Sequence, residues 1–317
     1  MLEVFFCNVG DGDAVLLREF REDGTKYSVL VDAGRPYVES REGSLRKDAV
    51  EYLLDRQVDR LDRMILTHPH IDHVGGAQRI LRAVPVDRLQ MLTVPPEDAR
   101  WVTRSFTSTA KPVNGLRQML NILRELTEEA RARGTAVETI PPGDQALTDR
   151  LGMTVYYPRP EVIDRQRQVF EILYRGGSVE DALCTQVAKE RNLSSLMLRF
   201  TYAGRSVLLT GDRYAADWEG ENIPPCDILK LPHHGDKKSM TAALLEKLSP
   251  WCAVISCEND PNARKERPSE QIAALLKSRL PLVLCTENRP MAAMEGSTGN
   301  GIRFEIRADG SVACHEE

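Results

Sequence analysis

The sequence lacks the marks of a membrane protein, a secreted protein and a nucleotide-cofactor enzyme. No apolar run approaches the ~20 residues needed to span a bilayer. The opening run from Leu2 to Val9 has no basic region before it and indicates a strand, not a secretory signal. No glycine-rich phosphate loop follows an expected strand, which argues against a nucleotide cofactor. We therefore expect a soluble, cytoplasmic protein that does not act at a membrane.

Close pairs of cysteines are also missing. The seven cysteines stand at positions 7, 184, 226, 252, 257, 285 and 314, and several of them lie in apolar runs. This spacing indicates reduced, mostly buried thiols, and neither a disulfide framework nor a thiolate metal site.

An excess of positive charge is absent too, because the formal net charge of the 317 residues is −5. This charge argues against broad electrostatic attraction to nucleic acid. A local basic groove, or bound metals, could still hold a phosphate group, so the net charge does not decide the substrate.

The most informative segment runs from Met64 to Gly76. It contains three of the six histidines of the chain, His68, His70 and His73, together with Asp72. The pattern predicts a strand, a polar loop and a helix, and it places these four side chains around one point. Imidazole suits zinc and other transition metals and carboxylate suits harder ions, so the set predicts one or two divalent metals bound without thiolate. The alternative is a polar loop in which Asp72 caps the helix, but capping leaves the histidines unexplained.

Helices and strands alternate in both halves of the chain. The pattern fits two sheets packed face to face with helices outside, a four-layer αββα sandwich, better than a doubly wound sheet. The length permits one elaborated domain or two, and we expect a single domain over residues 1–317. The expected strands lie at about 2–9, 14–17, 27–34, 64–66, 137–140, 153–157, 194–201, 206–210, 226–231, 251–256 and 281–285.

A charged segment at about 161–190 is helical in pattern and is interrupted by Gly176 and Gly177. Such an excursion could form a wall or lid over the site, or it could be a solvated helical hairpin. A longer amphipathic helix at about 116–133 is expected to pack on its own domain, because most helices with one apolar stripe do so.

Two later strand ends carry further ligand types. Asp212 directly follows a buried strand at 207–210, and His233 with His234 follows the strand that ends near Leu231. Asp212 could instead cap a helix starting at Arg213, and either histidine could be a satisfied core residue. Both segments are strand exits, where binding groups concentrate.

The residues resemble those of the metallo-β-lactamase-fold hydrolases, and most closely the stand-alone relatives of the hydrolase domain of ComEC competence proteins. The resemblance covers nearly the whole chain and rests on several segments in order. They are Asn8-Val9-Gly10-Asp11-Gly12-Asp13-Ala14, Val31-Asp32-Ala33-Gly34, the loop from Thr67 to Gly76, Asn192-Leu193-Ser194-Ser195-Leu196, Leu209-Thr210-Gly211-Asp212 and Pro232-His233-His234-Gly235.

The resemblance implies two divalent metal ions, zinc or manganese, at one edge of the facing sheets. It assigns His68 and His70 to the first metal and Asp72 and His73 to the second. It makes Asp212 the bridge between the metals. One of His233 and His234 would complete the second site. The carboxylate of Asp32 would accept hydrogen bonds that support the metal loop, Thr67 to Gly76, and Asp13 could help in the same way.

Two departures from the family pattern bear on activity. Where many members have a third histidine for the first metal, this chain offers Asn192 and Ser194, so the first metal should be weaker, more water-rich and more tolerant of manganese than of zinc. Where ComEC-type domains have a histidine-proline segment, this chain has Arg267 before Pro268. Arg267 could clamp a phosphate or carboxylate, or it could be a solvated charge before a helix.

The leading prediction is a metal-dependent phosphodiesterase or nuclease. A water shared by two cations would have its pKa lowered from about 15.7 toward about 7, and the hydroxide would attack phosphorus. Asp72 or Asp212 could orient it, while Lys230, Lys237 or Lys238 could contact a phosphate backbone. One alternative is hydrolysis of a carboxylic ester, lactone or thioester, although the missing histidine argues against a true β-lactamase. Another is a catalytically silent metal-binding or partner-binding module, with its protein partner unknown.

Overall fold

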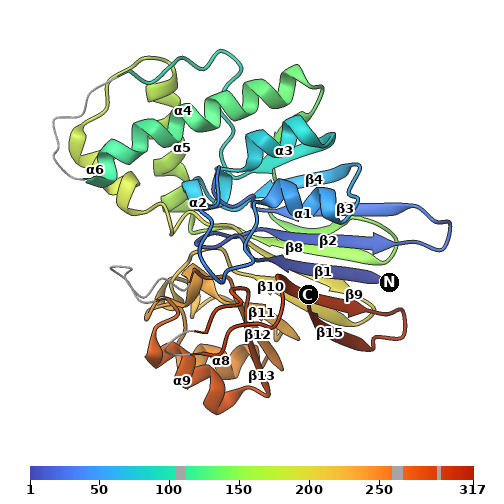
Figure 1. The fold of residues 1–317 in the computed structure, drawn as a ribbon. Coiled ribbons are helices and arrows are strands. Elements are labelled where there is room, and N and C mark those ends of the chain that lie inside the picture. Colours follow the sequence, from blue (N-terminus) through green and yellow to red (C-terminus); the bar gives the residue numbers. More distant parts are fainter. Residues whose placement is uncertain (104–110, 259–266, 291–293) are drawn as a thin grey trace.

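The computed structural model describes residues 1–103, 111–258, 267–290 and 294–317, and the side chains of these residues except 111–114. Within them, two sheets face each other and helices cover the outer face of each sheet (Figure 1). The expected four-layer αββα architecture is therefore confirmed.

The first sheet has eight strands and contains the N-terminal part of the chain. From one edge to the other its strands are β15 (Val312–Glu316), β14 (Gly301–Ile306), β1 (Leu2–Cys7), β2 (Val15–Phe20), β3 (Lys26–Val31), β4 (Leu61–Leu66), β5 (Val86–Met91) and β6 (Ala136–Thr139). The strands from β3 to β6 are parallel, and the others pair antiparallel. Strand β5 was not predicted from the sequence.

The second sheet has seven strands, and the ligand candidates Asp212, His233 and His234 follow two of them. In spatial order they are β13 (Leu282–Cys285), β12 (Cys252–Ile255), β11 (Ile228–Lys230), β10 (Arg205–Leu209), β9 (Met197–Tyr202), β8 (Leu151–Tyr156) and β7 (Gly143–Ala146). Strands β10 to β13 run parallel to one another. Parallel neighbours put their carboxyl ends at the same edge, so the loops that follow β10 and β11 lie together.

The side chains of β1 show how the layers form. Because successive residues of a strand point to opposite faces, Val4 and Phe6 enter the core between the sheets and Phe5 enters the core under the helices. The core between the sheets also contains Phe200 from β9 and Ile228 from β11.

Helices cover both outer faces. The first sheet is covered by α1 (Ala49–Asp55), α3 (Ala77–Ala83), α4 (Lys111–Ala132), α5 (Pro160–Tyr174) and α6 (Asp181–Lys189), and the second by α7 (Ala215–Trp218), α8 (Ala242–Leu248) and α9 (Glu270–Arg279). Side-chain caps explain several helix starts, since Asp48, Thr241 and Ser269 each accept a hydrogen bond from a backbone N–H of the first turn.

The segment at 161–190 packs into the core of the first layer. It forms α5 and α6, which contact each other, and α6 also contacts α4. Phe170 and Leu173 of α5 are buried with Leu123 of α4. The segment is therefore not a solvated hairpin, and its role as a wall or lid over the site stays a prediction. The chain after α6 reaches the loop that follows β4, because the backbone N–H of Leu196 donates to the carbonyl oxygen of Thr67 at 2.9 Å.

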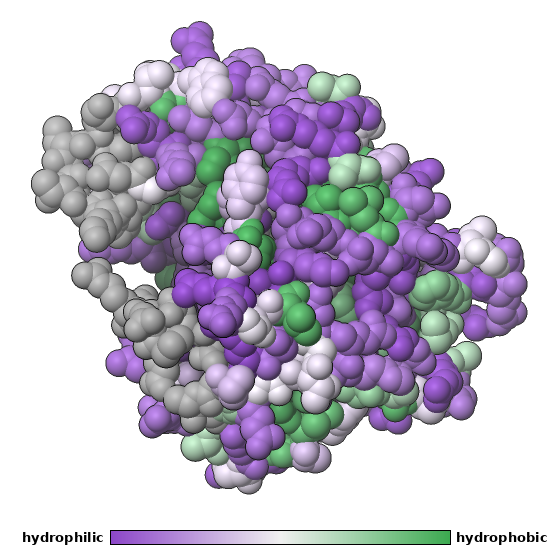
Figure 2. Space-filling view, in the orientation of Figure 1, coloured by the Kyte–Doolittle hydropathy of each residue, from purple (hydrophilic) through white to green (hydrophobic). Residues whose placement is uncertain are grey.

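No helix among the described residues is both long and apolar enough to cross a lipid bilayer. Figure 2 shows one face of the molecule, on which hydrophilic residues predominate and apolar residues lie in separate patches.

The packing of α5 can be tested by Phe170→Ala. Phe170 is 1% exposed, so we expect the substitution to lower the free energy of unfolding by about 3–5 kcal/mol. Leu54→Ala is the control, because Leu54 is 57% exposed and should change stability by less than about 0.5 kcal/mol. Urea denaturation measures both variants, and equal losses would contradict the packed position of α5.

Candidate metal centre

The ligand residues meet where parallel strands of both sheets end. Asp32 follows β3, His68 and His70 follow β4, Asp212 follows β10 and the paired histidines follow β11. In the first sheet β3 and β4 are parallel, and in the second β10 and β11 are parallel. The two sheets therefore deliver their loops to one common edge.

The metal loop is a short, tightly packed connection between β4 and a one-turn helix, α2 (Ile71–Val74), which is labelled in Figure 1. His70 is the residue before this helix, and Asp72 and His73 lie on it. Gly76 fixes the loop against β3, because a Cβ atom at this position would lie 2.2 Å from the carbonyl oxygen of Ala33. No other residue type fits that approach without moving the backbone.

Two groups of ligand atoms converge at this edge, and Asp212 belongs to both. One group consists of His68, His70 and Asp212, and the other of Asp72, His73, Asp212 and His234, with the ligand atoms of each group within 4.8 Å of one another. His68 Nε2 lies 3.6 Å from Asp212 Oδ2, and His73 Nε2 lies 3.4 Å from Asp212 Oδ1. The geometry thus gives Asp212 a position from which each carboxylate oxygen can serve a different cation.

The donor atoms of the second group fit a metal. His73 Nε2, His234 Nε2 and Asp212 Oδ1 are buried without a hydrogen-bond partner among the described residues. The other ring nitrogens are taken, because His73 Nδ1 lies 2.7 Å from Asp32 Oδ2 and His234 Nδ1 lies 3.0 Å from the carbonyl oxygen of Ser256. Buried polar atoms are rarely left unpaired, and metal-binding histidines usually donate their second nitrogen to such an oxygen.

Of the paired histidines, His234 belongs to the ligand group. Its Nε2 lies 3.4 Å from Asp72 Oδ2. Both His233 and His234 have left-handed backbone angles, with φ of 48° and 56°, in the turn η1 (Pro232–Gly235). Such conformations cost about 1–3 kcal/mol each and concentrate at functional sites. With these backbone angles, the two adjacent imidazoles point in different directions, His234 toward Asp72 and His233 toward Arg267.

The pKa values of the two histidines in the first group, His68 and His70, favour the form that binds a cation. Burial lowers the pKa of His68 well below its usual value, and burial with the charge of Arg191 lowers the pKa of His70 to about 4. Both imidazoles are therefore neutral near pH 7, the form that binds metals. His68 Nε2 and His70 Nδ1 face each other at 3.0 Å.

The carboxylates of the centre are held ionised. Burial alone would raise the pKa of Asp72, but the imidazole of His234, 3.4 Å away, and the charge of His73 outweigh it and hold the pKa well below its usual value. The pKa of Asp212 is likewise held well below its usual value, because the nearby imidazole of His73, at 3.4 Å, outweighs burial. Burial would lower the pKa of His73, but Asp212 and Asp32 raise it well above the usual value, so a metal would displace a proton there.

Arg267 lies beside His233 at the rim of the centre. Its Nη2 is 2.7 Å from His233 Nε2, and its Nη1 is 3.4 Å from Asp11 Oδ1. The Nδ2 atom of Asn192 also approaches His233 Nε2, at 3.4 Å. Because guanidinium donates hydrogen bonds and does not accept them, His233 Nε2 is an acceptor here. The Nε atom of Arg267 is buried without a hydrogen-bond partner among the described residues.

Ser194 and Ser195, which follow Asn192 and Leu193, form hydrogen bonds with backbone groups. Ser194 donates its hydroxyl to the carbonyl oxygen of Arg191 at 2.7 Å, so it turns away from the ligand atoms. Ser195 accepts a hydrogen bond from the backbone N–H of Asp212 at 3.2 Å. Sequence reasoning quoted Ser195 only as part of a motif, although the structure makes it the residue that positions Asp212.

Lys230 does not lie where the sequence placed it. It was expected to contact a substrate, but it is 1% exposed and its Nζ donates to Asp13 Oδ2. A third cluster of possible ligands, Asp13, Asp32 and His73, lies at this point. The ammonium group pairs with Oδ2 of Asp13 and Asp32 accepts from His73, while Asp13 Oδ1 is buried without a hydrogen-bond partner among the described residues. Lys230 is thus an internal cation beneath the centre.

Comparison with known proteins supports the family resemblance. A family model described as Metallo-beta-lactamase superfamily matches residues 7–257. Among curated proteins, ComE operon protein 3 of Bacillus subtilis (strain 168) is 27% identical over 301 residues, which are 90% of this chain and 32% of that protein. The chain therefore spans about one third of the length of this relative.

Solved structures also match most of the chain, at low identity. The metallo-beta-lactamase fold protein YhfI from Bacillus subtilis is 12% identical, with a TM-score of 0.47 over 90% of this chain and 96% of that one. A structure described as a new diphosphatase from the PhnP family is 13% identical, with a TM-score of 0.48 over 97% of this chain and 98% of that one. Likeness at this level says nothing about the substrate.

The support that Asp32 gives can be tested by Asp32→Asn. Asp32 accepts hydrogen bonds from the backbone N–H and the hydroxyl of Thr67, each at 2.8 Å, and from His73. We expect the substitution to weaken metal binding by about 10–100-fold, because a neutral amide holds the imidazole less firmly. Competition with a metallochromic chelator measures the affinity. Asp309→Asn, in an exposed turn, is the control, and equal affinities in both variants would contradict this role.

The buried pair of Lys230 and Asp13 can be tested by a double-mutant cycle. Lys230→Met leaves a buried carboxylate without its cation, so we expect a loss of about 3–5 kcal/mol in the free energy of unfolding. Asp13→Asn should also destabilise the protein. The double variant should lose about 0.5–3 kcal/mol less than the sum of the two single losses. Urea denaturation in the presence of a chelator measures all three, and additive losses would show that the pair does not interact.

Proposed function

Because the chain belongs to the metallo-beta-lactamase superfamily, we propose that it is a metal-dependent hydrolase whose substrate is a phosphodiester. The observation that supports the metal dependence is the pair of ligand groups that share Asp212. The two groups contain imidazole and carboxylate and no thiolate, a donor set that suits zinc or manganese.

Each group would hold one divalent cation. His68, His70 and Asp212 would hold the first, and Asp72, His73, Asp212 and His234 the second. Two cations so placed supply an activated water and neutralise the charge that develops on a phosphoryl group. The first group has three protein ligands against four in the second, so its cation would bind more weakly and keep more water.

The charges around the ligand groups favour a phosphodiester over a carboxylic ester. The charge of Arg191 acts on His70, and Arg267 contacts His233. A phosphodiester is an anion, whereas an ester, lactone or thioester is neutral in the reacting part and gains nothing from two flanking guanidinium groups before the reaction. Arginine also presents paired donors that match two phosphate oxygens.

Carboxylates, an arginine and a histidine at the centre would each have a separate role in the reaction. Asp72 and Asp212 are ionised carboxylates of the ligand groups, and either of them would be able to orient the attacking water. Arg267 offers its unpaired Nε to a nonbridging oxygen of the phosphate. His233, held by Arg267 and Asn192, fixes the direction of that guanidinium group.

The proposal is tested by hydrolysis of a bis-aryl phosphate, single-stranded DNA and RNA with added manganese or zinc. We expect turnover in the native protein, and we expect His68→Ala and His70→Ala each to lower kcat/KM by about 100-fold or more, as weakened metal binding requires. His315→Ala is the matched control, because this histidine lies far along the chain on β15 with a side chain that is 42% exposed.

Lactone and thioester substrates provide the contrasting arm of the test. Faster turnover of these neutral substrates than of any phosphodiester would assign the protein to ester hydrolysis. Absence of turnover with every substrate, combined with a partner that still binds when all metal ligands are replaced, would identify a silent binding module.

A further inference from the structure

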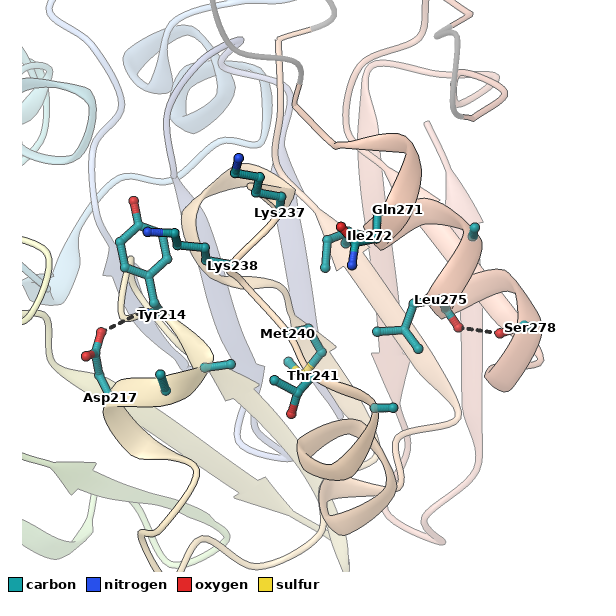
Figure 3. Close-up of a pocket in the computed structure, with 14 residues that line it drawn as sticks. Tyr214, Asp217, Lys237, Lys238, Met240, Thr241, Gln271, Ile272, Leu275 and Ser278 are labelled. Atoms are coloured by element: carbon teal, nitrogen blue, oxygen red, sulfur yellow. Dashed lines mark hydrogen bonds between the residues drawn. The ribbon is translucent and has the colours of Figure 1, made fainter.

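A groove crosses the outer helical layer of the second sheet, next to the metal centre. It has a volume of about 980 Å³ and is bordered by α7, the segment before α8, α8 itself and α9 (Figure 3). This size is at the upper end of the range for ligand sites. We call it the α7–α9 groove, and it extends from Tyr214 at one end to Ser278 at the other.

One end of the groove lies against the metal centre. The ring of Tyr214, which lines the groove, meets the ring of His233 edge-on at 4.9 Å between centroids. His233 in turn lies 3.9 Å from Asp212 Oδ2 and is bonded to Arg267. A molecule bound along the groove could therefore continue into the centre without leaving the surface.

The wall nearest the centre is cationic. Lys237 and Lys238 line it, and Figure 3 shows the ammonium group of Lys238 beside the ring of Tyr214 and that of Lys237 directed away from the apolar residues. The Nζ atom of Lys238 lies 5.8 Å from the centre of the Tyr214 ring. In the part of the chain that the structure describes, neither lysine has a carboxylate within 4 Å of its ammonium group.

The acidic groups nearby are tied to the backbone. Asp217 is the one carboxylate among the described residues that line the groove, and it accepts a hydrogen bond from the backbone N–H of Tyr214 at 3.2 Å. Asp236, outside the lining, accepts from the backbone N–H of Lys238 at 3.1 Å. The charge of Lys238 acts on Asp217, but neither carboxylate lies within ion-pair distance of an ammonium group of the two lysines.

The floor of the groove is apolar, with Met240, Ile272 and Leu275. A second groove beside the β2–β3 hairpin provides a contrast within the same molecule. Its volume is about 390 Å³ and its ionisable lining is mainly acidic, with Glu19, Glu22, Asp23 and Asp149 against Arg21 and Arg150. Positive charge, an aromatic ring and an apolar floor thus coincide in the groove that adjoins the metal centre.

We propose that the α7–α9 groove binds the strand of a single-stranded nucleic acid that continues from the phosphodiester at the metal centre. Proteins that bind single strands without sequence preference combine a cationic groove with aromatic rings on which bases stack. The lysines would contact backbone phosphates, while Tyr214 and the apolar floor would contact bases. This inference rests on the proposed function, and it narrows the substrate to a polymer, because a small diester held at the centre does not extend to α9.

The binding test uses the metal-loaded protein and an oligothymidylate of about twelve nucleotides, within the usual site size for single strands. In each linkage of this oligonucleotide, sulfur replaces one nonbridging oxygen of the phosphate, because this replacement slows hydrolysis. We expect Lys237→Gln/Lys238→Gln to weaken binding and to make the slope of log K against log salt shallower by about 1.4, or about 0.7 for each lost phosphate contact. Fluorescence anisotropy at several salt concentrations measures both quantities.

The matched control is Lys26→Gln/Lys47→Gln, which removes the same charge from the opposite sheet. Lys26 begins β3 and Lys47 precedes α1, so neither lines the groove. Equal slopes and affinities in the two double variants would overturn the proposal. Equal affinity of the native protein for an oligoglutamate of the same charge would overturn the assignment to nucleic acid, because it would show that the groove accepts any polyanion.

A hydrolysis test separates this inference from the proposed function. We expect the ratio of kcat/KM for the oligonucleotide to kcat/KM for bis-aryl phosphate to fall at least about tenfold in Lys237→Gln/Lys238→Gln, equivalent to 1.4 kcal/mol. An unchanged ratio, with bis-aryl phosphate still hydrolysed, would overturn the groove alone. Failure of the native protein to hydrolyse any phosphodiester would overturn the proposed function, and the salt slope would still decide whether the groove binds the strand.

Discussion

The arrangement of the site depends on one shared carboxylate. Asp212 faces His68 with one oxygen and His73 with the other, at 3.6 and 3.4 Å. A buried carboxylate in this position would be costly without cations or donors on both sides, because its two oxygens cannot reach water. The surrounding histidines and the backbone support from Ser195 therefore form one unit with it. Replacing any one of them changes the electrostatic environment of the others.

The fold meets this demand by bringing loops from two sheets to one edge. Parallel strands on both sides end there, and the connections are too short and too closely packed to adjust freely. Gly76 lies against the carbonyl of Ala33, and Gly12 would place a Cβ atom 2.6 Å from the carbonyl oxygen of Asp72. These contacts fix the loops by steric exclusion, which leaves the ligand atoms preorganised and their burial unavoidable.

The sequence predicted what depends on local pattern, and it failed where the outcome depends on distant packing. The four-layer fold and the loop from His68 to His73 follow from periodicity and clustering. The burial of Lys230 could not be predicted, because its partner Asp13 lies 217 positions away along the chain. Arg191 was missed for the same reason, since nothing beside it in the sequence shows that α6 ends near His70. The single-domain organisation and the roles of individual ligands stay predictions.

In the proposed function, the distribution of positive charge is what would allow a chain with a net charge of −5 to bind an anionic substrate. Lys230 lies beneath the centre and neutralises Asp13, so it is hidden from solvent and attracts nothing. Arg191 and Arg267 lie beside the ligand atoms, while Lys237 and Lys238 lie on the wall of the α7–α9 groove. Internal cations hold the acidic ligands in place, and peripheral cations remain available to a substrate. Local placement, and not net charge, therefore sets the sign of the molecule that the edge can accept.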